Sequence, residues 1–236
     1  MRYNQRFFLT GTTLPELLIA ITVASFLLIM LSNWCISVYH YNVQQQQRLQ
    51  LQQDVHQALQ LMTKDIRRSG YHYPIKNNNL ALFRYQNRSI NLVLPKQDYY
   101  QCALFFYDLN KDGCIGNRQG NNACMQGNQN KSTAIQKELF GYRLMSGNLE
   151  VLFMFSGSMN DNCSIVSCQQ HLHNPTCNGK GWMKYFDQHY YVEDVAFRWL
   201  PENRGIRADL TVSLRDRPNI RYQAQSFIPL INESYE

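Results

Sequence analysis

The stretch that decides the fold reads Gly11-Thr12-Thr13-Leu14-Pro15-Glu16-Leu17-Leu18-Ile19-Ala20, and it opens a long apolar run. Two arginines, Arg2 and Arg6, precede it, and apart from Glu16 no other charged side chain appears until Arg48. The uncharged residues 17–39 are about the ~20 residues that a membrane-spanning helix needs. A carboxylate near the end of such a span is costly, so Glu16 is a candidate functional residue that requires a partner.

Two other kinds of apolar N-terminal segment were compared with this one. A secretory signal peptide has a basic start, but it carries no acid before its apolar stretch and ends at small residues. Here the run leads into Ser32-Asn33-Trp34-Cys35, which is neither a good cleavage site nor a lipobox. An uncleaved single-pass anchor remains the alternative. In either case Arg2 and Arg6 favour a cytoplasmic N-terminus, with the chain after the span outside.

These residues resemble the class III signal of type IV pilins, in which a short basic leader ends in glycine and glutamate is the fifth mature residue. The resemblance implies cleavage by a prepilin peptidase between Gly11 and Thr12, followed by methylation of the new amino terminus. It makes Glu16 the fifth mature residue, whose carboxylate can pair with the terminal amine of an adjacent subunit and set the register. A residue at the membrane interface with no assembly role is the alternative for Glu16. Thr12 stands where phenylalanine is usual in such signals.

Beyond the span, residues 40–69 are predicted to continue the same helix into water. Apolar residues recur at mostly three- and four-residue steps between glutamines and charges, which indicates one apolar stripe on a polar helix. The stripe consists of Val43, Leu51, Val55, Leu59, Met62 and Ile66. Gly70, followed by Pro74, is predicted to end the helix.

After residue 80 the period changes to two, which predicts strands. The expected strands are Ser89–Leu94, Cys102–Tyr107, Glu138–Met145, Leu149–Phe155, Val192–Trp199, Ile206–Leu214 and Tyr222–Leu230. Ser146-Gly147-Asn148 is the clearest hairpin turn. Two stretches, 117–131 and 157–181, are rich in Asn and Gly and are predicted to be loops. The expected fold is therefore α+β: a long N-terminal helix whose C-terminal half packs on a mainly antiparallel sheet.

The net charge of the chain excludes few classes of function by itself. The formal net charge of the 236 residues is +6, and the leader supplies two of these charges. Arginines gather late in the chain, but Glu202, Asp209 and Asp216 are interleaved with them. A solvated strand face explains that pattern, and no run of spaced aromatics and lysines supports nucleic-acid binding.

Six of the seven cysteines follow the span, and Cys35 lies within it. An even number in an exported domain favours three disulfides, although six cysteines allow fifteen connectivities. The spacings contain no paired C-x-x-C knuckles, so a zinc site is the weaker interpretation.

Several segments of the head extend the resemblance. Asp65-Ile66-Arg67-Arg68-Ser69-Gly70-Tyr71 is similar to the helix end of J- and W-type minor pilins, and the strand from Cys102 into Asp108 also matches. So do Phe140–Leu144 and Cys177–Trp182, and together they resemble the prepilin-peptidase-dependent protein B branch of the type IV minor pilins. Spacing and this resemblance together order the disulfides. Cys114–Cys124 and Cys163–Cys168 are local bridges inside long insertions at 117–131 and 157–175, and Cys102–Cys177 joins the two segments that match the family.

The sequence offers one candidate metal site and one candidate catalytic site. Asp108, Asn110, Asp112 and Gly113 reproduce the start of a calcium loop, but Gln119 stands where a bidentate glutamate belongs. A polar turn explains the same residues, so at most weak calcium binding is expected and no other cofactor.

A catalytic site of His171 and His173 with Cys168 or Cys177 is disfavoured by the expected disulfides. No serine elbow, phosphate loop or metalloprotease helix motif is present, so no enzymatic activity is expected.

The resemblance implies a low-abundance pilin that primes or caps pilus assembly. Its expected parts are a leader (1–11), a membrane and assembly half of the helix (12–39), an exposed half (40–69) and a periplasmic head (70–236). The expected partners are the prepilin peptidase, other minor and major pilins bound through the helix, and the inner-membrane assembly platform. The protein would occupy the inner membrane and then the pilus on the cell surface. A minor pseudopilin of type II secretion and an anchored periplasmic binding protein are the alternatives.

Overall fold

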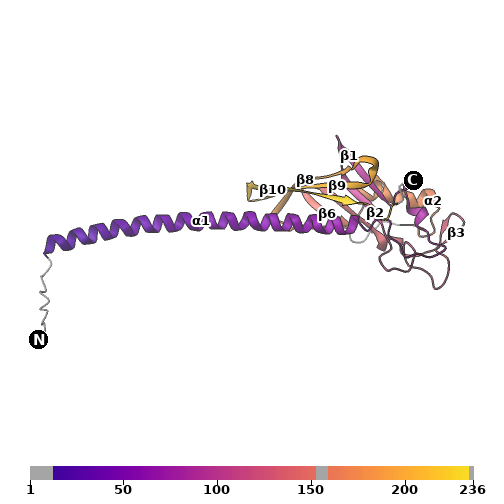
Figure 1. Cartoon of the computed structure of the whole chain (residues 1–236), viewed down its shortest axis with the longest axis horizontal. Coiled ribbons are helices and arrows are strands. Elements are labelled where there is room, and N and C mark those ends of the chain that lie inside the picture. Colours follow the sequence, from indigo (N-terminus) through magenta and orange to yellow (C-terminus); the bar gives the residue numbers. More distant parts are fainter. Residues whose placement is uncertain (1–12, 153–158, 234–236) are drawn as a thin grey trace, which may run out of the picture. The chain divides into compact units, whose positions relative to one another are not determined.

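The computed structural model describes residues 13–152 and 159–233. The chain divides into two compact units, Met1–Gln47 and Arg48–Glu236. One helix, α1 (Leu14–Ile66), contributes residues to both units (Figure 1).

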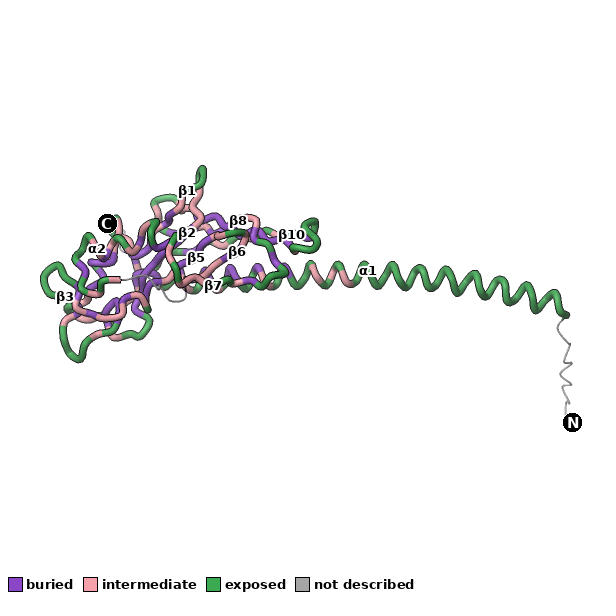
Figure 2. Tube along the Cα trace, turned by 180° about the vertical axis from the view of Figure 1, so that it is seen from behind, coloured by how far each residue is buried: buried purple, intermediate pink, exposed green. Residues whose placement is uncertain are grey.

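The first unit consists, in its described part, of the N-terminal turns of α1. Pro15 lies in the first turn, where its missing N–H donor costs little. The apolar side chains that follow are exposed along the helix (Figure 2). The helix is long and apolar enough to cross a membrane. Because these side chains are exposed in the part of the chain that the structure describes, a lipid or a bundle of similar helices is the environment that would bury them.

The second unit contains an antiparallel sheet. Its strands are β1 (Ile90–Lys96), β2 (Tyr99–Phe106), β5 (Leu139–Met145), β6 (Asn148–Leu152), β7 (Trp182–Lys184), β8 (Tyr190–Trp199), β9 (Gly205–Leu214) and β10 (Arg217–Pro229). The strand order is β10-β9-β8-β2-β5-β6-β7, and β1 pairs with β2. Each of the seven strands expected from the period-two pattern corresponds to one of these. The last residues of the expected strand Leu149–Phe155 lie outside the described residues.

The turn between β5 and β6 is the hairpin turn that the sequence predicts. Ser146 and Gly147 both have positive φ, at 50° and 70°, and Met145 pairs with Asn148 across the turn. Two consecutive residues with positive φ define a type I′ turn, whose twist matches that of the flanking strands.

One face of the sheet packs against the C-terminal turns of α1. The helix residues buried there are Leu51, Val55, Ala58, Leu59, Met62 and Ile66. They join Phe105 of β2 and Phe197 of β8, both fully buried, in one hydrophobic core. The predicted stripe is confirmed from Leu51 onward, whereas Val43 is only half-buried and lies in the first unit.

Polar contacts fix the helix on this face. The hydroxyl of Tyr142 on β5 donates to the carboxylate of Asp65 at 2.6 Å, and Tyr190 on β8 donates to Asp54. Thr63 and Ser226 on β10 share a hydrogen bond of 2.8 Å. Hydrogen bonds at several points along the helix select one rotation and one register over the sheet, which apolar packing alone specifies less sharply.

The opposite face of the sheet carries a second core. Along β2, Ala103 and Phe105 face the helix, whereas Cys102, Leu104 and Phe106 belong to this second core. The alternation follows from the period of two in a strand that is buried on both faces. Leu80, Leu82 and Phe83 of a 3-10 turn and the two long insertions cover this face.

The insertions are not the plain loops that their composition predicts. The first contains a small hairpin of β3 (Met125–Gln126) and β4 (Gln129–Asn130), and the second contains α2 (Ile165–Gln169) and α3 (Asn174–Cys177). Four short 3-10 turns complete the described elements: η1 (Leu80–Phe83), η2 (Ile135–Glu138), η3 (Gln170–Leu172) and η4 (Pro201–Asn203). These elements are too short to produce a readable period, which is why composition alone misassigns them.

The two insertions contact each other. The N–H of Asn130 donates to the carbonyl of Cys163 at 2.9 Å, and the side chain of Asn130 donates to the carbonyl of Asp161. Asp161 in turn accepts the backbone N–H of Ala134 at 2.9 Å. Both insertions lie past Ile66, where α1 ends, and not beside the helix (Figures 1 and 2). They therefore form one continuous surface at that end of the head.

Candidate functional site

Glu16 lies in the first turn of α1 and contacts the residue that precedes the helix. Its Oε2 accepts hydrogen bonds from the backbone N–H of Thr13 at 3.0 Å and from the Thr13 hydroxyl at 3.1 Å. A glutamate three residues after a threonine N-cap forms half of a capping box, which satisfies a backbone donor that a helix start leaves open. Glu16 therefore has a local role that the sequence analysis did not assign, although the T-x-x-E spacing from Thr13 to Glu16 signals it.

The serine and threonine hydroxyl groups of the span are satisfied inside the helix. Thr22 donates to the carbonyl of Ile19 at 2.8 Å, and Ser25 donates to that of Ile21 at 2.7 Å. Ser32 and Ser37 make the same bond to the carbonyl four residues earlier. Hydroxyl groups bonded in this way need no water, so they do not prevent the helix from entering lipid. Cys35 is a free, exposed cysteine in the same stretch.

The turn at Asp108 is closed by backbone donors. Asp108 is buried, and its Oδ2 accepts the N–H groups of Tyr73 and Gly113, both at 2.9 Å. Asp112 accepts the N–H groups of Cys114 and Arg118. In the part of the chain that the structure describes, no group of three His, Cys, Asp or Glu side chains is arranged to hold a metal ion. These oxygens are used by the turn itself, as in an Asx turn.

Glu138 is a buried residue of this turn that the sequence analysis missed. Its Oε1 accepts the N–H groups of Leu109 and Asn110, and its Oε2 accepts that of Gly116 at 2.7 Å. Burial raises the pKa of Glu138 to about 7, with a further contribution from the nearby charge of Asp108, although the three donors act in the opposite direction. Because Glu138 lies in an ordinary charged stretch, no local pattern distinguishes it. Its position under the turn, which only the tertiary structure shows, distinguishes it from the other acidic residues.

The six cysteines of the head form three disulfides in the expected pairing. Cys102–Cys177 joins β2 to α3 with 6.4 Å between the Cα atoms, and it encloses a sequence separation of 75 residues. Cys114–Cys124 and Cys163–Cys168 are local, with separations of 10 and 5 residues. Four of the six cysteines, Cys102, Cys163, Cys168 and Cys177, belong to the second core, and Cys114 and Cys124 are equally buried. Cys102–Cys177 thus links the second insertion covalently to β2, and the other two bridges each close a short local loop.

The sequence is similar to a known protein family over most of its length. A family model described as prepilin peptidase-dependent protein B matches residues 44–230. The chain belongs to this family. It is also 32% identical over 193 residues to an uncharacterised protein of Haemophilus influenzae, with 78% of this chain and 81% of that protein covered. No solved structure matches.

Membership in the prepilin peptidase-dependent protein B family supports a link to the machinery that processes pilins. The matched residues begin at 44, so they include the sheet and all three disulfides but not Glu16. Gly11 and Thr12, between which cleavage is expected, lie outside the described residues. The processing site therefore rests on the sequence motif alone.

The cysteine–histidine site considered for this family member loses its nucleophile. Cys168 and Cys177 are both in disulfides, so neither offers a thiolate near His171 or His173. His171 is half-buried, and burial lowers the pKa of its imidazole. The ring of His173 packs edge-on against Tyr85 with 4.5 Å between the centroids. Both histidines are in positions that packing explains.

Proposed function

We propose that this member of the prepilin peptidase-dependent protein B family is a minor pilin that starts or caps pili. The observation that carries the proposal is one carboxylate, Glu16, at the start of a helix whose N-terminal part is apolar and otherwise uncharged, and whose other end packs on a sheet domain of that family. A helix of this kind can be extracted from the membrane only into a bundle of similar helices, which a pilus provides. The head would be periplasmic before assembly, and the inner-membrane assembly platform and other pilins would be its partners.

Processing is the first test. Cleavage after Gly11 by a prepilin peptidase should leave Thr12 as a methylated amino terminus. Mass spectrometry of the protein extracted from membranes identifies that terminus directly. Recovery of intact Met1 from cells with an active peptidase would contradict the proposal and favour an uncleaved anchor.

Glu16 requires a test that separates assembly from helix capping. The Glu16→Gln variant removes the charge but keeps a carbonyl oxygen that can accept from Thr13, so the cap survives. If the carboxylate pairs with a neighbouring amine in the assembly, Glu16→Gln should reduce pilus number by at least about tenfold, because the amine loses its buried partner. Thr13→Ala is the matched control, since it removes one capping donor and keeps the charge.

Normal piliation in Glu16→Gln cells, with the variant cleaved and inserted, would refute the pairing. An equal loss in Thr13→Ala cells would assign the effect to capping instead. Deletion of the gene with normal piliation and impaired protein secretion would identify the alternative, a minor pseudopilin of a secretion system.

The position at the tip is supported by the two insertions. They form one disulfide-held surface at an end of the head and add volume there. A subunit repeated along a fibre must leave its contact surfaces free, whereas a terminal subunit has one free surface. Quantitative mass spectrometry of sheared pili should find this chain at a small fraction of the major pilin. Equal amounts of the two would contradict the tip position.

We propose no catalytic role and at most weak calcium binding. Asp112 and Asp108 each direct a carboxylate oxygen to backbone donors that a metal would have to displace. Calorimetry of the purified chain should give a Kd of roughly 10⁻⁴ to 10⁻³ M or no response. A tighter site that Asp112→Ala abolishes would contradict this expectation.

A further inference from the structure

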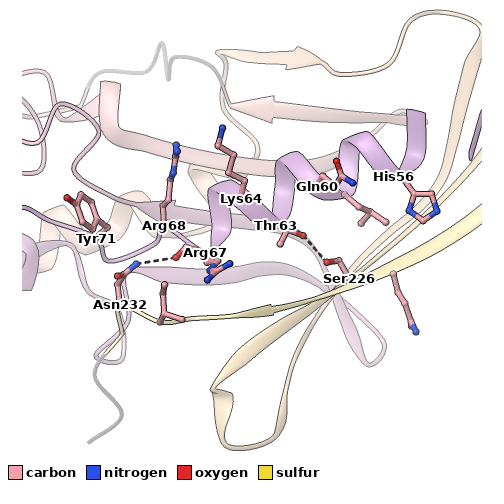
Figure 3. Close-up of a pocket in the computed structure, with 12 residues that line it drawn as sticks. His56, Gln60, Thr63, Lys64, Arg67, Arg68, Tyr71, Ser226 and Asn232 are labelled. Carbon is pink, nitrogen blue, oxygen red and sulfur yellow. Dashed lines mark hydrogen bonds between the residues drawn. The ribbon is translucent and has the colours of Figure 1, made fainter. Parts of the chain in front are cut away.

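A groove of about 730 Å³ lies between the last turns of α1 and the strand β10 (Figure 3). All of its lining residues belong to the second unit. Leu59 forms part of its apolar floor, and the hydrogen bond between Thr63 and Ser226 crosses it. Ile231 is 59% exposed and lines the groove beside Asn232, whose amide donates to the carbonyl of Arg67 at 3.1 Å. The groove is therefore a formed feature with an apolar base.

Three cations line this groove, one from the last turn of α1 and two from the residues that follow the helix. Lys64, Arg67 and Arg68 are all exposed, and Lys64 and Arg68 extend in the same direction from neighbouring turns (Figure 3). Among the described residues, no carboxylate forms an ion pair within 4.0 Å of any of the three. Arg68 instead lies over the ring of Tyr107, 5.8 Å from its centroid. The groove thus has positive charge and no anionic group of the head neutralising it by direct contact.

Several other arginines of the head form ion pairs with carboxylates. Arg143 pairs with Glu150 at 2.6 Å, and Arg198 and Arg207 share the carboxylate of Asp209 at 2.8 Å each. Ion pairs within the head are therefore common for its arginines, whereas the three cations of the groove form none with a described carboxylate. A cluster of unpaired cations beside an apolar floor is complementary to an acidic peptide segment.

The strand beside the groove has a free edge. β10 is the terminal strand of the sheet and pairs only with β9 among the described strands. Gln225 and Ser226 of β10 line the same groove as the three cations. An edge strand of this length is a template for an added strand from another chain.

We propose that this groove binds an extended acidic segment of another pilin-type subunit, which pairs with the edge of β10 and places carboxylates against Lys64, Arg67 and Arg68. This inference rests on the proposed function, since it takes the partner from the same assembly. A peptide is favoured over a nucleic acid because the apolar floor and the strand edge match side chains and a peptide backbone. The cations would steer the segment, and the strand edge would fix its register.

Site-specific photo-crosslinking in piliated cells tests the proposal. A benzoyl-phenylalanine placed at Gln225 should form an adduct with a pilin-type subunit, and sequencing of the crosslinked peptide should show a segment rich in Asp and Glu. The same probe at Lys184, which is exposed on β7 at the other edge of the sheet, serves as the control position. The adduct should be absent there.

The charge requirement is tested with neutral substitutions, which avoid placing acids at the negative end of α1. Lys64→Gln/Arg67→Gln/Arg68→Gln should lower the crosslinking yield at Gln225 by about tenfold, as should an ionic strength of about 0.5 M with purified pili. Lys137→Gln/Lys180→Gln/Lys184→Gln removes the same charge elsewhere on the exposed surface and should leave the yield unchanged.

Pili that require this chain but give no adduct at Gln225 would overturn the groove proposal and leave the proposed function intact. An adduct with a nucleic acid, or with a peptide that lacks carboxylates, would also overturn it. Equal losses in the two triple variants would show that net charge, and not the groove, governs the contact. If deletion of the chain leaves piliation normal, the proposed function itself fails.

Discussion

The two faces of the sheet are covered in different ways. The face under α1 is closed by one continuous helix whose buried residues recur with the helical period, and it contains no cysteine among its buried residues. The opposite face is closed by irregular insertions and contains Cys102, Cys163, Cys168 and Cys177 in its core. Cooperative backbone hydrogen bonds hold a helix in shape, whereas short irregular segments gain less from such bonds. The comparison indicates that covalent links replace secondary structure where the cover is irregular.

The largest expected effect tests that replacement on the insertion-covered face. Cys102→Ala/Cys177→Ala should lower the free energy of unfolding by about 4 kcal/mol, because this disulfide closes the longest loop in the unfolded chain. Cys163→Ala/Cys168→Ala should lower it by about 2 kcal/mol, since its loop is short. Urea denaturation of the full chain in detergent micelles, followed by tryptophan fluorescence, measures both. A larger loss from the local bridge would break the argument from loop length.

On the helix-covered face, packing replaces covalent links. Met62 is fully buried between α1 and the sheet, so Met62→Ala should lower the free energy of unfolding by about 3 kcal/mol. Leu49 lies on the same helix but is 58% exposed, and Leu49→Ala should cost about 0.5 kcal/mol or less. The same denaturation experiment compares the two. Similar losses at both positions would show that the helix is not held by this stripe.

The unfolding free energy should depend on pH through Glu138, which lies under the turn beside the insertions and not on the helix-covered face. The pKa of Glu138 is raised to about 7 in the folded state, so the folded chain binds this proton more tightly than the unfolded chain does. Its contribution to stability is present below about pH 4.5 and is lost as the pH rises through about 7, which amounts to roughly 3 kcal/mol.

The Glu138→Gln variant should flatten the fall in unfolding free energy between pH 5 and pH 8, measured by urea denaturation at each pH. The control is Glu202→Gln, because the ion pair of Glu202 with Arg204 is exposed and contributes little to stability, whereas the pair of Glu150 with Arg143 is nearly buried. An unchanged slope in Glu138→Gln would assign the pH dependence to another group.

The smallest expected effect sharpens the account of the helix-covered face. Tyr142→Phe removes the hydroxyl that donates to Asp65 at 2.6 Å and should cost about 1 kcal/mol. Tyr191→Phe, at an exposed tyrosine, is the matched control and should be neutral. If Tyr142→Phe is also neutral, apolar contacts alone fix α1 on the sheet.

The sequence predicts the helix-covered face better than the opposite face, for a physical reason. A stripe such as Leu51 to Ile66 and the alternation along β2 are long enough for their periods to be read. The hairpin at Met125–Gln126 and the helix at Ile165–Gln169 are too short for this and were predicted as loops. Their contact through Asn130 depends on residues far apart in the sequence, which no local pattern reports.

The candidate site shows the same division. The isolated charge of Glu16 before an apolar run is evident from the sequence, and its capping contact with Thr13 could have been predicted from their spacing. Glu138 could not, because its effect arises from burial under a turn that tertiary structure creates. The groove beside Lys64 and Arg67 also requires β10, which follows them by more than a hundred residues.

The junction at Gly70 sets an order of events during biosynthesis. Gly70 has a φ of +74°, and a Cβ there would lie 3.1 Å from the carbonyl oxygen of Asn232. The side chain of Asn232 also donates to the carbonyls of Arg67 and Ser69, and Glu233 accepts the N–H of Ser89. A ribosome releases residue 70 long before residue 232. The carbonyls of Arg67 and Ser69 at the helix end therefore lack their bonds to Asn232 until the last part of the head has been synthesised. The head can reach its native state only when its synthesis is nearly finished.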